Sequence, residues 1–269
     1  PKVEQFVVNA SEDNEQTFAA GDKIVLTASY SDNRELSRGT FLLSSGFYGQ
    51  TNVTRNPENS LYYSNIFELS GEKKGTEQTV VASPSTLAGP YNVQTYCEDE
   101  AGHESHRRIY NIITTHPNMP VVDIQNVGPG LNGNLVFIRA GANVSFRGLA
   151  SADASGSELT LARLDIIAPA GYTEFTKDIV LTNSTNPGEP VTQYDLADLG
   201  EFTVPASTIK GDYKMLFTIT NALGHQNVQM HLLSSQEAHR CSCWWIAQAA
   251  FCLASLGFHV FRNGQLVRD

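Results

Sequence analysis

"GPYNVQTYCEDEAGH" occupies residues 89–103, and "GDYKMLFTITNALGH" occupies residues 211–225. Both stretches begin with Gly, a spacer and Tyr, continue with an alternating segment, and end in a polar turn closed by Gly-His. The two tyrosines, Tyr91 and Tyr213, are 122 positions apart (213 minus 91), and the glycines of the two turns are separated by the same distance. A hairpin repeated at the spacing of a whole domain indicates an internal duplication.

The similarity extends outward from these two hairpins. The matched segments, in order, are 85–91 with 207–213, 19–29 with 139–149, 34–45 with 157–169, and 1–3 with 120–122. Along these pairs the offset drifts only between 119 and 123, as small loop insertions would produce. Because such a period is too long for a solenoid repeat, it predicts two complete domains in series.

The secondary-structure signal within each unit is β throughout. Short runs rich in β-branched and aromatic residues are separated by clusters of Gly, Pro, Asn and Asp. In the segment 91–96, Tyr91, Val93 and Thr95 alternate with the intervening residues, as in a half-buried strand. About seven such strands in roughly 115 residues are typical of an immunoglobulin-like sandwich. The sequence therefore predicts an all-β chain of two tandem immunoglobulin-like β-sandwich domains.

The duplication also places the domain boundaries. We expect the first sandwich over 1–117, the second over 118–235, and an apolar tail of unassigned structure over 236–269. Pro117 and Pro120 lie at the first boundary, and proline favours extended geometry in the residue before it. This composition predicts a short, stiff linker.

Tyr91 and Tyr213 stand where the penultimate strand of each predicted sandwich begins. A tyrosine in this place buries its ring, and its hydroxyl donates a hydrogen bond to the preceding corner of the backbone. Gly102 and Gly224 end the turns that follow, where the backbone needs a positive φ. These residues indicate the fold, and they do not indicate a catalytic or binding function.

The pattern Gly-x-Tyr-x-x-strand-"EDEAGH"-strand is similar to the last hairpin of bacterial immunoglobulin-like and PKD-like modules. Together with "AGDKIVLTA" (20–28) and "AGANVSF" (140–146), it resembles the cell-adhesion lipoproteins of Bacteroides-type bacteria over about 1–235. The resemblance implies export to the cell surface, the outer membrane or the periplasm. It also implies an anchor that lies outside this chain, and it supplies no catalytic residue.

Charge and cysteine usage limit the partners and the means of stabilisation. The net charge is −10, so the chain repels polyanions and we expect no nucleic-acid partner. Of the 4 cysteines, only Cys97 precedes the tail, so no disulfide framework spans the two units. Packing must therefore hold the sandwiches together.

The tail differs abruptly from the rest of the chain. Residues 241–261 include both tryptophans and three cysteines, and they contain no Asp, Glu, Lys or Arg. This run is long enough for a membrane-spanning helix, which needs about 20 residues. The alternatives are an element packed on the second sandwich, the start of a third module, and a sequence artefact. Membrane attachment is therefore expected from an anchor outside the chain or, as the weaker alternative, from 241–261.

Two predicted loops of the first sandwich carry carboxylates. Asp32 lies in the loop 31–35, and Asp99 and Glu100 lie in the turn 98–103. The two loops share one end of a sandwich, so the three side chains could gather around Ca²⁺, which binds six to eight oxygens. Solvated turns are the favoured interpretation, and we expect no cofactor.

Four aromatic residues are candidates for a glycan platform, because sugar faces stack on rings. Phe47 and Tyr48 lie in the Gly-rich loop 44–54, and Tyr62 and Tyr63 follow it. They define an alternative function, a glycan-binding module of a carbohydrate-uptake system that uses residues 44–63. The favoured interpretation places Tyr62 in the core and has Phe47 and Tyr48 plug their loop.

Catalytic signatures are missing from the sequence. It contains no Gly-x-Ser-x-Gly, His-Glu-x-x-His or P-loop motif. His103 and His225, which close the two repeated turns, are expected on the polar surface. We therefore expect a non-enzymatic exported surface protein for adhesion or protein–protein interaction, or a spacer presenting another function. Its partner would be a protein or glycan at the cell surface. A weaker alternative is the scaffold fragment of a larger enzyme.

Overall fold

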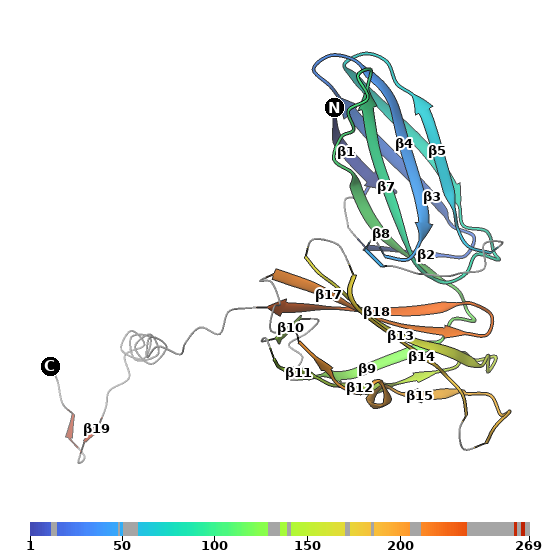
Figure 1. Cartoon of the computed structure of the whole chain (residues 1–269), viewed down its shortest axis with the longest axis vertical. Helices are drawn as coiled ribbons and strands as arrows, with labels where there is room; N and C mark the ends of the chain where they lie inside the picture. Colours follow the sequence, from blue (N-terminus) through green and yellow to red (C-terminus); the bar gives the residue numbers. More distant parts are fainter. Residues whose placement is uncertain are drawn as a thin grey trace.

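The computed structural model contains two β-sandwiches in series, each made of a three-stranded and a five-stranded sheet (Figure 1). The predicted all-β class and the two immunoglobulin-like sandwiches are thereby confirmed. The structure describes residues 1–11, 15–47, 49–50, 59–128, 135–138, 141–169, 173–183, 186–204 and 211–235, and the pairs 261–262 and 265–266.

The first sandwich contains strands β1 to β8. Its smaller sheet has the order β1 (Lys2–Val8), β3 (Lys23–Ser31), β6 (Lys73–Val81). Its larger sheet has the order β2 (Glu15–Ala19), β8 (Arg108–Thr115), β7 (Gly89–Asp99), β4 (Leu36–Ser45), β5 (Tyr63–Glu68). β2 pairs with β8 in parallel, and the other pairs are antiparallel.

The second sandwich repeats this order. Its smaller sheet is β9 (Val121–Val127), β12 (Phe146–Ser151), β15 (Gln193–Asp195). Its larger sheet is β10 (Leu135–Ile138), β18 (Gln226–Ser235), β17 (Gly211–Asn221), β13 (Leu159–Ile167), β14 (Thr173–Val180). β10 runs parallel to β18, as β2 does to β8, so the duplication seen in the sequence is also a duplication of topology.

Five short elements complete the description. They are the pair β11 (Asn143–Val144) and β16 (Phe202–Thr203), the 3-10 helix η1 (Leu196–Leu199), and the pair β19 (Phe261–Arg262) and β20 (Gln265–Leu266). The rest of the predicted tail 236–269 lies outside the described residues, and this includes the alternative spanning segment 241–261 up to residue 260. In the part of the chain that is described, no helix has the length and apolar character needed to cross a membrane.

Each sandwich has its own apolar core between its sheets. In β3 the burial alternates strictly. Ile24 and Leu26 are buried in the core, and the residues next to them are exposed or half-buried. Tyr91 and Phe41 are among the largest side chains of the first core, and Phe217 occupies the second. Alternation at a period of two is the geometric property of a strand that the sequence pattern had predicted.

The tyrosine at the start of β7 behaves as expected. The Tyr91 hydroxyl donates a hydrogen bond of 2.8 Å to the carbonyl of Leu87, and its ring is fully buried. Tyr213 is likewise buried, although the corner before it, residues 205–210, lies outside the described residues. Gly102 and Gly224 have φ of 82° and 85°, which confirms the positive φ predicted for both turns.

The linker between the sandwiches is short. β8 ends at Thr115 and β9 begins at Val121. Between them the backbone makes a turn in which the Met119 N–H donates to the His116 carbonyl at 3.0 Å. The chain thus passes directly from the last strand of one sandwich into the first strand of the next (Figure 1).

Candidate functional site at the junction of the two sandwiches

Phe47 does not present its ring to a ligand. It follows the end of β4, its exposed fraction is 2%, and it packs with Ile167, Leu216 and Val228 of the second sandwich. The interpretation of Phe47 as a glycan platform is therefore corrected, because a ring buried on protein atoms has no free face for a sugar. The residue fills the space between the two domains instead.

The other three aromatic candidates have different positions. Tyr62 has an exposed fraction of 67%, so the expectation that it packs in the core is wrong. The Tyr63 ring packs against the first core, and its hydroxyl donates to Gln78 at 3.0 Å. Tyr48 lies outside the described residues. Tyr62 is thus the accessible ring among the three that the structure describes.

The two carboxylate-bearing loops do lie side by side, since the Glu100 N–H donates to the Glu35 carbonyl at 3.3 Å. Their carboxylates, however, have local partners. Asp99 accepts from the His103 backbone and ring, both at 2.8 Å, and these bonds lower the pKa of Asp99. Asp32 Oδ1 lies 3.3 Å from the Pro1 nitrogen.

In the described ranges, no three His, Cys, Asp or Glu side chains gather as a metal ion would require. This holds for Asp32, Asp99 and Glu100 as well. Hydrogen bonds within the turn hold Asp99 in place.

An apolar cluster lies where the first sandwich meets the outer face of β13, β17 and β18. The buried members are Phe47 from the first domain and Ile167, Leu216 and Val228 from the second. Ile113 and Met230 pack against them. Fully burying a side chain of this size contributes about 1.5–3 kcal/mol, so this cluster favours the docked arrangement.

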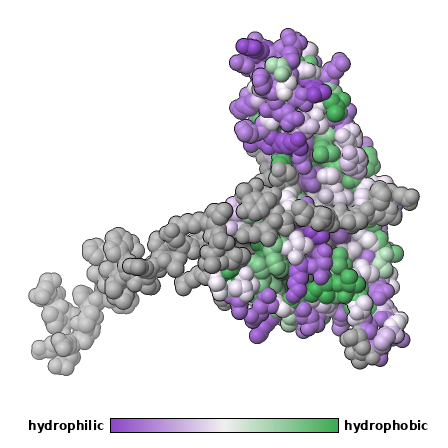
Figure 2. Space-filling model, in the orientation of Figure 1, coloured by the Kyte–Doolittle hydropathy of each residue, from purple (hydrophilic) through white to green (hydrophobic). Residues whose placement is uncertain are grey.

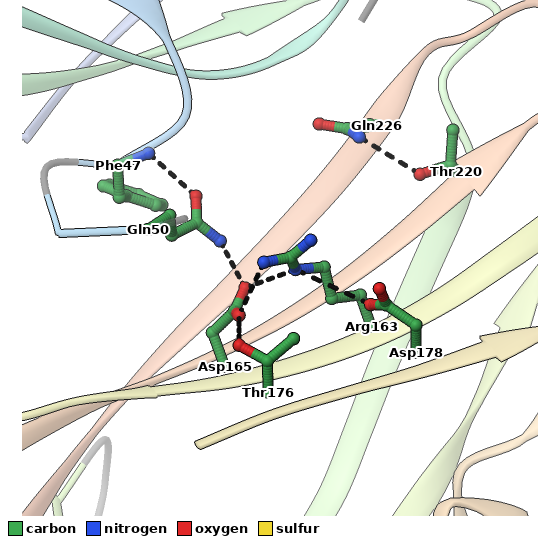
Figure 3. Close-up of polar contacts among 8 residues, drawn as sticks. All are labelled: Phe47, Gln50, Arg163, Asp165, Thr176, Asp178, Thr220 and Gln226. Carbon is green, nitrogen blue, oxygen red and sulfur yellow. Dashed lines mark hydrogen bonds and ion pairs between the residues drawn. The ribbon is translucent and has the colours of Figure 1, made fainter. Parts of the chain in front are cut away.

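A buried ion pair lies beside the apolar cluster (Figure 3). Asp165 on β13 is fully buried and accepts from Arg163 Nε at 2.8 Å and Nη2 at 3.0 Å. Thr176 on β14 donates to it at 2.7 Å, and Gln50 of the first domain donates at 2.6 Å. A buried charge is costly unless it is paired and hydrogen-bonded. The hydrogen bond from Gln50 therefore helps to stabilise the buried Asp165 carboxylate and links the first domain to the second.

Hydrogen bonds to main-chain carbonyls complete the junction. Asn221 and Asn227 of the second domain donate side-chain N–H groups to the linker carbonyls of Asn118 and Pro120, at 2.7 and 2.8 Å. The Gln226 N–H donates to the carbonyl of Ala88 at 2.9 Å. Polar bonds of fixed direction thus join the second hairpin to both the linker and the first domain's corner.

His225 is a further correction. It was expected on the polar surface, yet its exposed fraction is 6% and its ring stacks on His116. His103, at the same place in the first repeat, is exposed as expected. The difference arises because the turn of the second hairpin meets another domain, whereas the turn of the first faces solvent.

A groove of about 470 Å³ lies elsewhere on the second sandwich, between the edge strands β14 and β15. Tyr194 lines it, and burial followed by the charge of Asp198 raises the pKa of Tyr194 to about 12. Its hydroxyl is buried without a hydrogen-bond partner among the described residues. That hydroxyl alone does not define a class of ligand.

The polar and apolar surface is unevenly distributed between the two domains. Figure 2 shows hydrophilic residues over the far end of the first sandwich and apolar residues gathered on the second, in this view. Val180 on β14, at the edge of the groove, is among the exposed apolar residues. Single exposed residues of this kind are common on protein surfaces, so they add no site.

Comparisons with known proteins give the chain no family. No family model matches it, and no curated protein matches it. Among solved structures, the fibronectin(III)-like modules of Clostridium thermocellum CbhA match 88% of this chain and 96% of theirs, with 11% identity and a TM-score of 0.26. Dimeric latent PorU from Porphyromonas gingivalis matches 87% of this chain and 20% of its own, with 12% identity and a TM-score of 0.26.

At these TM-scores neither match carries an argument about what the chain does. The class of protein is given by its own sheets, which are those of a tandem of immunoglobulin-like sandwiches.

Proposed function

We propose that the chain is a non-enzymatic, exported surface protein whose two sandwiches form a rigid tandem. Its role would be adhesion or protein–protein interaction, or the spacing of another function from its anchor. The resemblance to Bacteroides-type cell-adhesion lipoproteins supports a place at the cell surface, outer membrane or periplasm. The partner would be a protein or glycan, and the anchor would lie outside the chain or, less favoured, in 241–261.

The observation that carries this proposal is the buried junction. Domains joined by a short linker move relative to each other by default, unless their interface is large and apolar. Here Phe47 fills an apolar cluster of the second domain, and Gln50 completes the hydrogen bonds of its buried Asp165. A spacer or adhesin needs this property, because a fixed angle keeps the far end at a defined distance from the anchor.

The test is ¹⁵N relaxation of the full chain at pH 8. We expect one rotational correlation time for both sandwiches in the wild type. Phe47→Asp buries a charge against Leu216 and near Asp165, so we expect two shorter, separate correlation times. The control is Tyr62→Asp, which changes an exposed ring and should leave the common value intact. Separate tumbling of the wild-type domains would contradict the proposal.

The alternative function as a glycan-binding module no longer includes Phe47, whose ring is buried, and it depends on the exposed ring of Tyr62. A glycan array with the wild type and Tyr62→Ala separates the two functions. Binding that disappears in Tyr62→Ala would favour the carbohydrate-uptake module, whereas an array without a hit is the result we expect.

A further inference from the structure

The junction contains a stacked pair of histidines from the two sides. His116 belongs to the linker, and His225 closes the turn between β17 and β18. Their ring centroids lie 4.2 Å apart with an interplanar angle of 14°. Two imidazolium rings at this distance would repel each other, so the stack disfavours protonation of both rings at once.

Each ring accepts a backbone hydrogen bond at Nδ1. The Asn118 N–H donates to His116 at 3.1 Å, and the Ala88 N–H donates to His225 at 3.0 Å. A nitrogen that accepts cannot carry a proton, so the proton of each neutral ring is on Nε2. Adding a proton at Nδ1 would remove the acceptor in both cases.

The His225 bond joins the two domains directly. Ala88 belongs to the corner before β7, is fully buried, and also accepts from the Gln226 N–H at 2.9 Å. The two bonds join Ala88 to the side chain of His225 and to the main chain of Gln226. If His225 stops accepting, the Ala88 N–H is left buried and unpaired, which disfavours the docked state.

The segments that make these contacts supply no other charged side chain. Residues 87–90, 116–120 and 221–227 contain no Asp, Glu, Lys or Arg. Asp153 approaches the turn, with Oδ2 3.5 Å from Asn221 Nδ2.

Two more titratable groups lie on the neighbouring segments. Glu158 is next to the turn through its carbonyl, which accepts from the Ala222 N–H at 2.8 Å, while its side chain is exposed. His231 lies further along β18 and is buried.

We propose that His116 and His225 form an acid-sensitive latch, which holds the tandem rigid in neutral solution and releases it in mildly acidic solution. The inference rests on the proposed function, since it describes how the same junction is regulated. Release frees the angle between the sandwiches while each keeps its own core.

The direction of the effect follows from proton counting. The docked state keeps Nδ1 of His225 unprotonated because that atom accepts from the Ala88 N–H, whereas separated domains release this bond. An imidazole takes up a proton in mildly acidic solution, so docking is strongest in neutral solution and weakens on acidification.

The experiment is ¹⁵N relaxation of the full chain from pH 8 to pH 5, together with long-range ¹H–¹⁵N spectra of the histidine rings. We expect the common correlation time to be lost on acidification, at the same pH at which Nδ1 of His225 becomes protonated. Near-UV circular dichroism in the same samples should show that both sandwiches remain folded.

The variants separate the latch from general acid effects. In His225→Asn the side-chain oxygen can accept from Ala88 without titrating, so we expect rigid docking down to pH 5. His103→Asn changes the exposed histidine at the same repeat position and should respond to pH like the wild type. If His225→Asn does not dock at pH 8, the wild type decides alone, by whether loss of docking coincides with Nδ1 protonation of His225.

Each outcome decides one of the two proposals. Common tumbling of the wild type at pH 5, or loss of docking without Nδ1 protonation, overturns the latch and leaves the rigid tandem standing. Separate tumbling at pH 8 overturns the rigid tandem itself.

Discussion

His231 on β18 has an exposed fraction of 7%, and both of its ring nitrogens lack a hydrogen-bond partner among the described residues. Burial lowers the pKa of His231, since the charged ring would lose its hydration. The unfolded chain therefore takes up a proton below about pH 6.5 that the folded chain does not. His231 accordingly reduces stability as the pH falls.

We predict that His231→Leu stabilises the second sandwich. The substitution removes an unpaired buried polar group, so the free energy of unfolding should rise by about 1–2 kcal/mol at pH 7.5. The gain should be larger at pH 5.5, because the titrating group is gone. Urea unfolding at both values measures it, with the exposed His106→Leu as control. A loss of stability at both values would show that the ring has an essential partner.

At the scale of elements, β12 is irregular where it pairs with β9. The register shifts between Arg147 and Gly148, and Gly148 has a φ of 151°. A Cβ at Gly148 would lie 2.2 Å from the Asp123 carbonyl oxygen. The bulge thus requires a residue without a side chain at this position.

We predict that Gly148→Ala destabilises the β9–β12 pairing by at least about 1–3 kcal/mol, the usual cost of a strained backbone position. Gly75→Ala on β6 is the matched control, because its Cβ would meet only the Ala28 carbonyl, at 3.9 Å. Surface changes of that kind stay within about 0.5 kcal/mol. Thermal unfolding compares the two variants, and equal stability of both would show that the bulge relaxes without cost.

At the scale of the whole molecule, the outer face of β13, β17 and β18 depends on the first domain for cover. Gln94 of β7 and Leu216 of β17 are 122 positions apart, the offset of the repeated tyrosines. Gln94 donates to Asn92 at 2.7 Å within its own sheet, whereas Leu216 is buried against Phe47. The second sandwich is therefore apolar where it is docked.

We predict that the segment 118–235 alone unfolds at a lower temperature than the same sandwich in the full chain. Its apolar face and the Arg163–Asp165 pair would then be open to water. Phe47→Asp in the full chain removes the same cover and should lower the second transition in calorimetry by a similar amount. If the isolated segment unfolds at the temperature of the tandem, the junction contributes nothing to its stability.

Much of each sandwich could be predicted from the sequence because its signals are local. Alternation along β3 reports which side chains face the core, and the Gly102 and Gly224 turns need a positive φ wherever they occur. β7 departs from the alternation predicted for 91–96, because both of its faces are buried over 89–95. The Tyr91 hydroxyl reaches a carbonyl only four residues away. Such features depend on residues that are close in the sequence, so a repeated sequence pattern predicts a repeated fold.

The sequence by itself determined two immunoglobulin-like sandwiches, their duplication and the turns that close them. Only the tertiary structure decided that Phe47 is a plug between domains, that Asp165 has a partner in Gln50, and that His225 is buried while His103 is exposed. The physical reason is that a strand's period tells which side chains share a face. What covers the outer face is set by residues more than a hundred positions away, and no local pattern records them.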